Sequence, residues 1–434
     1  MGEAKSKGDN VFSVRNFRLV FFGALVSEIG AVLYSFAVGF YILEITDNNA
    51  FLQGLYLALC GVTLLLFTPV GGVLGDRFHK ARIMSVCDFL KGGLILLAIL
   101  PMVLFPQPKA HVVILFVVGV AGNAVSGIFN PASAAMLPNI VEEDRLQQAN
   151  AYFSVKNALE SIFGVVLAGV LYAALPIRLL FAVVGICYLL SGISEMFIRY
   201  AHVRKEERLT LRAALSDLRE GVGYLRGQKA ILTMMGAALF LTFFFSPIFG
   251  NYIPFFVRTD LAQAPSYLFD RVLTPELWSS VFSVLFGVSS LAASVLLSAR
   301  PQREKNGRRI ALRICGMAAF SIVLTAAYWL LVRRGASLNA YLLLLGFGFL
   351  LIGLLLVFIN VPLNTVIMRI VDKNQLSKVS SITSTISQGL IPISSVLAGL
   401  TLQNLGSTIL LAICSAGLTV TAVSLLFSRS IRSI

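Results

Sequence analysis

The chain has 434 residues, of which 57% are hydrophobic and only 13% are charged. An average soluble domain is roughly 45 to 50% apolar and about 25% charged, so this composition excludes a water-soluble fold. Twelve helices of about 20 residues each would cross a bilayer and leave roughly 190 residues for loops and ends. The formal net charge is +14. The basic residues fall between apolar runs, which favours a role in membrane topology over nucleic-acid binding.

Twelve apolar runs predict an all-α integral membrane protein with 12 transmembrane helices. The runs cover residues 17–44, 51–75, 82–104, 111–137, 147–175, 177–199, 230–257, 277–299, 310–332, 338–367, 377–403 and 406–428. Between the sixth and seventh runs, leucines recur at helical spacing among charged residues, which is typical of an amphipathic helix on a membrane surface. We therefore predict a six-helix half over 1–200, a cytoplasmic amphipathic linker over 201–229 and a second six-helix half over 230–434.

An internal repeat supports this division into two pseudo-symmetric halves. Asn130 precedes Ile140-Val141 by the same spacing at which Asn360 precedes Ile370-Val371. Repeated halves joined by a linker are typical of secondary transporters, whose substrate path lies between the halves near the bilayer midplane.

The distribution of basic residues predicts the orientation of the chain. Most of the 35 Lys and Arg residues lie at the two ends, in the linker and in the loops that follow even-numbered helices. Cytoplasmic loops carry such an excess, so we expect both termini and the linker to be cytoplasmic. The predicted location is the plasma membrane, which the chain crosses many times.

Two motifs carry a resemblance to a known family. Residues 72–82 read Gly-Val-Leu-Gly-Asp-Arg-Phe-His-Lys-Ala-Arg, which resembles the Gly-x-Leu-x-Asp-Arg-x-Gly-Arg-Lys motif of the major facilitator superfamily. His79 replaces the usual glycine, and the final basic pair is split into Lys80 and Arg82. Residues 130–150 are similar to the helix 4 to 5 signature of the macrolide-efflux and enterobactin-exporter-like branch of drug:proton antiporters. The resemblance covers nearly the whole chain and implies the major facilitator fold.

The first motif suggests a conformational latch formed by Gly72, Asp76, Arg77 and Arg82. Gly72 and Gly75 have no side chains and would let a neighbouring helix approach closely. Asp76 can lie at the positive end of a helix, and the arginines can bind carboxylates or anionic headgroups. In relatives the aspartate is thought to hold the halves together near helix 11. The alternative is that Asp76 and Arg77 only cap a turn and set topology.

Glu28 is the sharpest candidate for proton coupling. It lies about 16 Å along the first helix, near the middle of the membrane, and no basic residue lies within one helical turn of it. Such a carboxyl must be neutral or have a partner on another helix. The resemblance extends to Glu28 the acidic residue that drug and proton antiporters often carry in helix 1. A static hydrogen-bonded carboxyl is the alternative.

Other intramembrane charges stand in pairs at helical spacing, where they can meet on one helix face. The pairs are Asp88 with Lys91, Lys156 with Glu160, and Glu195 with Arg199. Asp88 and Glu160 are further candidates for proton coupling, although mutual neutralisation within each pair explains them equally. We expect Glu195 to have a structural role.

Polar uncharged residues in the apolar runs are candidates for the substrate path. They are Asn123, Asn130, Asn157, Asn360, Asn364 and Gln388. Amides in lipid also form helix-to-helix hydrogen bonds, and that role is open for each of them.

The predicted function is a secondary active exporter of hydrophobic or amphipathic small molecules, such as drugs, macrolides or siderophore-like compounds, driven by protons through alternating access. We expect a monomer that contacts membrane lipids and binds no nucleic acid, metal or cofactor; no enzyme motif or ATP-binding motif is present. Helix 5 lacks the Gly-Pro core and helix 4 the arginine that some proton-coupled relatives use. A lipid or lysophospholipid translocator, or a facilitator without proton coupling, is therefore the alternative.

Overall fold

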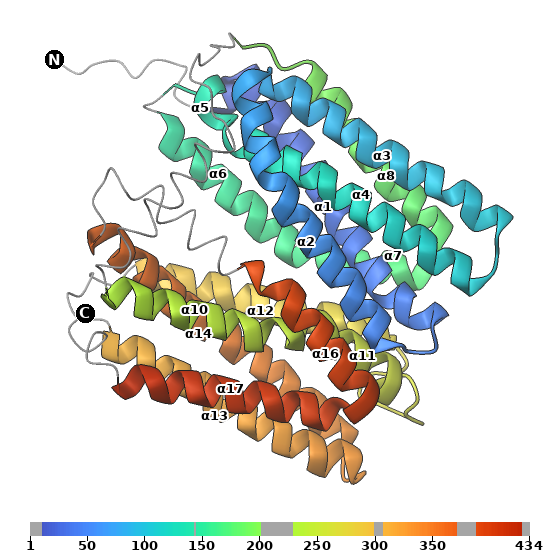
Figure 1. Ribbon diagram of the computed structural model, residues 1–434, viewed down its shortest axis with the longest axis vertical. Coiled ribbons are helices and arrows are strands. Elements are labelled where there is room, and N and C mark those ends of the chain that lie inside the picture. The colour runs from blue at the N-terminus through green and yellow to red at the C-terminus, as the bar shows by residue number, and fades with distance from the viewer. Residues whose placement is uncertain (1–10, 143–144, 201–228, 299–306, 371–387, 428–434) are drawn as a thin grey trace. The chain divides into compact units, whose positions relative to one another are not determined.

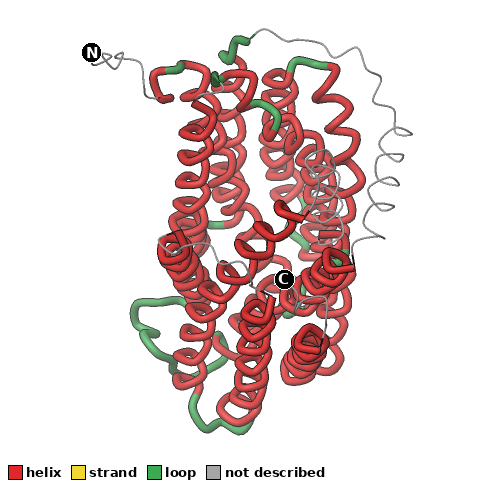
Figure 2. Tube along the Cα trace, turned by 90° about the vertical axis from the view of Figure 1, so that its left-hand side faces the viewer, coloured by secondary structure: helices red, strands yellow, loops and turns green. Residues whose placement is uncertain are grey.

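The computed structural model describes residues 11–142, 145–200, 229–298, 307–370 and 388–427. All regular elements in these ranges are helices (Figure 2). Eleven of the described helices are long and apolar enough to cross a membrane, and a shorter apolar helix spans Ile391–Leu405. A helix satisfies its own backbone hydrogen bonds, as hydrocarbon requires. The predicted all-α membrane fold is thus confirmed.

Contacts divide the chain into two compact units, of which unit 1 comprises Met1–Tyr41 and Val62–Thr210. Its helices follow one another in chain order with short connections (Figure 1). They are η1 (Val11–Ser13), α1 (Arg15–Ile45), α2 (Ala50–Arg77), α3 (Lys80–Leu104), α4 (Pro108–Ala134), α5 (Leu137–Ile140), α6 (Leu146–Leu159), η3 (Glu160–Gly164), α7 (Val165–Ala174) and α8 (Ile177–Met196).

Unit 2 comprises Ile42–Gly61 and Leu211–Ile434. Its helices are α10 (Lys229–Pro247), η4 (Ile248–Tyr252), α11 (Ile253–Phe256), η5 (Val257–Leu261), α12 (Pro275–Ser298), α13 (Gly307–Ala327), η6 (Tyr328–Arg333), α14 (Leu338–Ile370), α16 (Ile391–Leu405) and α17 (Ser407–Phe427). The predicted linker over 201–229 and much of the predicted helix over 377–403 lie outside the described residues. The division into six-helix halves stays a prediction.

Close packing of α3 against α8 forms one side of unit 1. A Cβ atom on Gly92 would lie 2.9 Å from the carbonyl oxygen of Gly185, so the two backbones approach to a distance that only glycine allows. The Ser85 hydroxyl also donates a hydrogen bond to the carbonyl of Gly192 at 2.8 Å. These contacts fix the register in which α3 presents its charged residues to α8.

The end of α1 and the beginning of α2 belong to unit 2. The backbone N–H of Ala50 donates to Oε1 of Gln403 in α16 at 2.9 Å. A Cβ on Gly54 would lie 2.3 Å from the carbonyl oxygen of Ser395, and one on Gly399 would lie 2.5 Å from the carbonyl oxygen of Ala50. Residues 42–61 are therefore packed tightly against α16 by backbone contacts that depend on both glycines.

Several spans contain π-helical turns, which are rare and often occur at functional sites. The turn η3 interrupts the fifth span between α6 and α7, and η4 and η5 interrupt the seventh span on either side of α11. Pro247 immediately precedes η4 and has no N–H to donate to the helical ladder. These irregular turns carry Glu160, Asn251 and Arg258.

Candidate functional site

An ion cluster inside the spans of unit 1 joins Glu28 of α1 to Lys156 of α6 and Glu160 of η3. The ammonium of Lys156 forms an ion pair with the carboxylate of Glu28 and lies 3.6 Å from Oε2 of Glu160. The side chain of Lys156 is only 1% exposed, whereas that of Glu28 is 39% exposed. The ammonium also lies 5.6 Å from the centre of the Phe153 ring. Glu28 has no basic neighbour within one helical turn, so the sequence required it to be neutral or to have a partner on another helix. The structure shows such a partner, Lys156.

The charges of this cluster do not balance when all three groups are ionised. Two carboxylates around one ammonium leave a net charge of −1, and a single proton makes the cluster neutral. A net charge inside a membrane costs several kcal/mol, so the neutral form gains stability where water is excluded. Glu28 is the most exposed member of the cluster, at 39% against 18% for Glu160 and 1% for Lys156.

A cavity of about 310 Å³ lies within unit 1 between α1, α3, α4 and α8. Its polar lining includes Tyr34, Lys91, Asn123 and Tyr188. Lys91 is 7% exposed, and its ammonium lies 5.0 Å from the ring centre of Phe129 and 5.2 Å from that of Tyr188. Aromatic rings attract a cation in this position, so they hold the ammonium at the cavity wall.

Asp88 does not form the ion pair with Lys91 that the helical spacing suggested. In the described part of the chain no carboxylate oxygen lies within 4 Å of the Lys91 ammonium. Asp88 is fully buried against α8, faces Ser191 and makes no hydrogen bond of ordinary geometry. Its interaction with Lys91 is thus electrostatic over a longer distance. The cation–π contacts explain the difference, because they turn the lysine toward Phe129 and Tyr188.

Glu195 and Arg199 also fail to pair within the described residues. The helix α8 ends at Met196, so Arg199 leaves the helical register that would bring it over Glu195. Glu195 is fully buried and interacts electrostatically with Asp88 and Lys91. The loss of the last helical turn accounts for this incorrect prediction.

The predicted latch after α2 is only partly described. No described atom lies within 4 Å of a Cβ on Gly72, whereas a Cβ on Gly71 would lie 2.4 Å from the carbonyl oxygen of Gly127. The close approach expected at Gly72 stays a prediction. Arg77 and Arg82 are exposed. The side chain of Asp76 and residues 371–387 lie outside the described part, and the latch stays a prediction.

The predicted path amides are scattered. Asn123 lines the cavity of unit 1, where its amide donates to the carbonyl of Gly119 at 2.8 Å. The side chain of Asn364 is not described, and the remaining four amides are exposed: Asn130, Asn157, Asn360 and Gln388. Only Asn123 is therefore brought together with another candidate group, the ammonium of Lys91.

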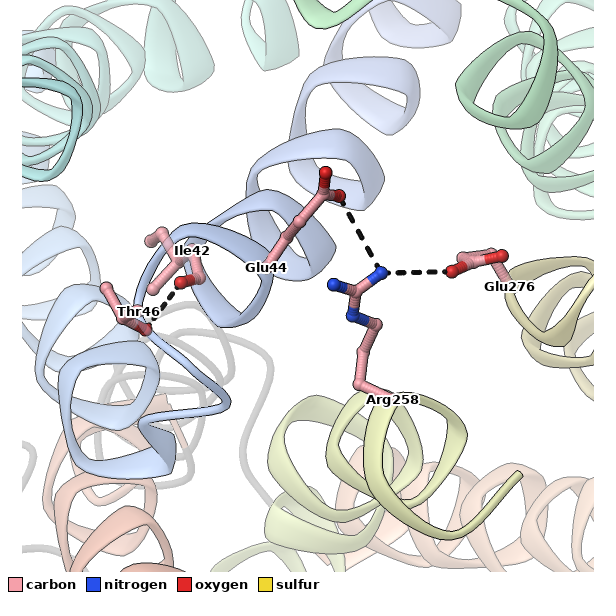
Figure 3. Close-up of polar contacts among 5 residues, drawn as sticks. All are labelled: Ile42, Glu44, Thr46, Arg258 and Glu276. Carbon is pink, nitrogen blue, oxygen red and sulfur yellow. Dashed lines mark hydrogen bonds and ion pairs between the residues drawn. The ribbon is translucent and has the colours of Figure 1, made fainter. Parts of the chain in front are cut away.

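Unit 2 contains a second ion cluster, which sequence analysis did not identify (Figure 3). Arg258 of η5 places Nη1 at 3.7 Å from Oε2 of Glu44, near the end of α1, and at 3.3 Å from Oε1 of Glu276, in the first turn of α12. The Arg258 side chain is 21% exposed. Arginine stays protonated at all physiological pH values, so this cluster holds the α1 end by a permanent charge.

A weak signal for this second cluster is present in the sequence. Glu44, Arg258 and Glu276 each lie at the end of an apolar run, on the side of the membrane that carries few charges. Charged residues on the side of the membrane that carries few charges are expected to have partners of opposite sign. Sequence spacing alone could not pair them, because six apolar runs separate Glu44 from Arg258.

No group of three or more His, Cys, Asp or Glu side chains that could hold a metal ion occurs in the ranges that the structure describes. The charged groups described inside the spans are instead the cluster of Glu28, Lys156 and Glu160 and, at the cavity wall, the ammonium of Lys91. Such an arrangement can bind a small molecule and a proton, and it offers no activated nucleophile.

Comparisons with known proteins identify the family. The family model of the Major Facilitator Superfamily matches residues 20–395. The uncharacterized MFS-type transporter YkuC of Bacillus subtilis is 22% identical over 76% of this chain and 75% of its own length. Macrolide efflux protein A of Streptococcus pyogenes is 23% identical over 54% of this chain and 58% of its own.

Two further similarities concern an exporter and the fold. The enterobactin exporter EntS of Citrobacter koseri is 27% identical over 36% of this chain and 37% of its own length. The crystal structure of a bacterial homologue of the iron transporter ferroportin has a TM-score of 0.72 at 16% identity, and the match covers 96% of this chain and 99% of that one. The predicted family and its efflux branch are confirmed by these matches.

Proposed function

The chain belongs to the Major Facilitator Superfamily, and from this premise we propose that it is a proton-coupled exporter of hydrophobic or amphipathic small molecules. It is a multi-pass membrane transporter, not an enzyme. Its relatives include proteins named for macrolide efflux and enterobactin export. We place this protein in the plasma membrane with both termini in the cytoplasm, in line with its basic loops.

The cluster of Glu28, Lys156 and Glu160 carries the proposal. It lies within the spans, has a net charge of −1 before a proton binds, and includes one partly exposed carboxylate. An intramembrane ionisable cluster of this kind is expected to serve ion or proton movement. We propose that Glu28 takes up the coupling proton and that Lys156 holds the remaining carboxylate.

The contact between residues 42–61 and α16 supplies the conformational part of the proposal. Alternating access requires contacts that form in one state and open in the other. The Arg258 cluster and the hydrogen bond from Ala50 to Gln403 are suited to this role, because they fasten the end of α1 and the start of α2 to unit 2. We propose that they open when the transporter releases its compound outside the cell.

The decisive experiment compares proton flux with compound exchange in proteoliposomes that contain a pH-sensitive dye. A macrolide and a lipophilic cation are added separately to wild type, Glu28→Gln and Glu142→Gln. Glu142 is a matched control, since it is an exposed glutamate that pairs only with Arg145 in the loop before α6. We expect Glu28→Gln to reduce compound-dependent proton flux at least tenfold, because a glutamine amide cannot take up and release a proton in this pH range.

Exchange of one compound molecule for another involves no net proton movement, so Glu28→Gln should retain it while Glu142→Gln retains both activities. Proton flux that persists in Glu28→Gln would contradict coupling through this cluster. Compound transport without any proton flux in wild type would contradict coupling altogether and favour a facilitator. Flux restricted to fluorescent lysophospholipids would favour a lipid translocator.

A further inference from the structure

A groove of about 640 Å³ lies on unit 1 where α3 begins and α8 ends, apart from the ion clusters described above. Its polar rim includes His79, Arg82, Arg199 and Tyr200, and its apolar wall includes Val86 and Met196. The groove thus combines cationic and apolar side chains, as a site for an amphipathic anion such as a phospholipid requires.

The positive charge of the rim is not neutralised within the described residues. Arg82 and Arg199 are both exposed, and no described carboxylate oxygen lies within 4 Å of either guanidinium. Glu195 also lines the groove, but its carboxyl oxygens are completely buried. The groups that a ligand meets at the rim are therefore cationic, and guanidinium groups bind phosphate oxygens in a fixed geometry.

Hydrogen bonds hold the segment after α8 in place, so the rim of the groove has a defined structure. The N–H of Arg199 donates to Oδ1 of Asn16 at 3.2 Å, and the Asn16 amide donates to the carbonyl of Arg199 at 2.5 Å. The N–H of Lys80 donates to the hydroxyl oxygen of Tyr200 at 2.9 Å. Burial raises the pKa of the Tyr200 phenol above its usual value, which keeps this hydroxyl protonated.

The position of the groove matches the depth of lipid headgroups. Arg82 lies in the first turn of α3, and Arg199 lies three residues beyond the end of α8, so both stand where spans leave the hydrocarbon. Val86, six residues inside the start of α3, and Met196, the last residue of α8, are large apolar side chains exposed to the surroundings. Basic residues at this depth attract anionic lipids, most strongly on the cytoplasmic leaflet, where the Lys and Arg distribution places this end of unit 1.

We propose that this groove is a binding site for an anionic phospholipid. Its phosphate lies between the guanidinium groups of Arg82 and Arg199, and an acyl chain follows Val86 and Met196 between α3 and α8. Because Arg82 belongs to the loop motif that follows α2, the bound lipid fastens that loop to the end of α8. This site is independent of the exported compound and of the coupling proton.

The test measures lipid adducts on the full-length protein by native mass spectrometry after delipidation in detergent. Phosphatidylglycerol and phosphatidylcholine are titrated separately into wild type, Arg82→Gln/Arg199→Gln and Arg178→Gln. Arg178 is a matched control, an exposed arginine at the opposite end of α8. We expect the double variant to bind phosphatidylglycerol about 30-fold more weakly, since each interfacial basic residue contributes roughly one kcal/mol.

Wild type and Arg178→Gln should prefer phosphatidylglycerol over phosphatidylcholine to the same extent. Equal binding of the two lipids by wild type, or equal losses in the double and control variants, would overturn the proposal. Arg82→Lys/Arg199→Lys keeps both charges and should retain most of the preference, which tests the site even if the neutral double variant does not fold. Competition by millimolar inorganic phosphate as strong as by the lipid would identify a free-phosphate site instead.

Discussion

Two ion clusters in this protein have the same composition, one cation between two glutamates, but different surroundings. Lys156 is almost completely buried among Glu28, Glu160 and Phe153 inside the spans of unit 1. Arg258 is partly exposed between Glu44 and Glu276 at the ends of spans in unit 2. The comparison shows that composition does not define a role. Burial makes the first cluster sensitive to one proton, whereas exposure and a permanent guanidinium charge make the second a fastening.

The largest effect is expected from Lys156→Met, which leaves two carboxylates without a cation inside the membrane. Removing one partner of a buried ion pair costs about 3–5 kcal/mol. We expect a large fall in the melting temperature in detergent and no measurable compound-driven proton flux. Both quantities are measured on the same preparation, by differential scanning fluorimetry and in dye-loaded proteoliposomes.

Lys156→Arg is the control for that change, since it keeps the positive charge and should recover most of the thermal stability. If Lys156→Met melted and transported like wild type, the contrast between a buried and an exposed cluster would be lost. The same would follow if Arg258→Met had the larger effect on proton flux.

An intermediate effect is expected from Gly54→Ala, which tests the fastening of α2 to α16 without altering any charge. The added Cβ would lie 2.3 Å from the carbonyl oxygen of Ser395, so the two helices must separate. Such overpacking costs about 1–3 kcal/mol. Thiol crosslinking between Ala50→Cys and Gln403→Cys, in a background without the five native cysteines, should therefore be reduced several-fold.

Gly93→Ala in α3 is the matched control, because no atom lies within 4 Å of its added Cβ. Crosslinking in Gly93→Ala should equal that of the parent. Unchanged crosslinking in Gly54→Ala would show that this contact does not depend on close backbone packing.

The smallest effect is expected from Arg258→Gln. A partly exposed ion pair contributes about 0–1 kcal/mol, so thermal stability should change little. The same crosslinking assay should show a smaller loss than in Gly54→Ala, and high salt should reproduce part of this loss in wild type by screening the pairs. Loss of proton coupling in Arg258→Gln would contradict the assignment of this cluster to fastening alone.

Local features of the chain were sufficient to predict the membrane fold. The predicted run over 17–44 corresponds to α1, and that over 406–428 corresponds to α17, each within two residues at both ends. Hydropathy succeeds because hydrocarbon demands about 20 consecutive apolar residues in a helix, a requirement that each span meets alone. The family motif after α2 is likewise local, and the family that it indicated is confirmed by the match to the Major Facilitator Superfamily.

Pairings between distant residues depended on the tertiary structure. The sequence required a neutral state or a partner for Glu28, and only the packing of α1 against α6 identified Lys156 as that partner. It offered Asp88 for Lys91, but Phe129 and Tyr188 hold the ammonium elsewhere.

The sequence by itself predicted the apolar spans, the candidate charges within them and the family, because a continuous stretch of residues defines each of these features. Tertiary structure alone decided that residues 42–61 join unit 2 and that Arg258 lies between Glu44 and Glu276. The physical reason is that hydrophobic length acts along one helix, whereas an ion pair is fixed by the packing of helices that are far apart in the chain.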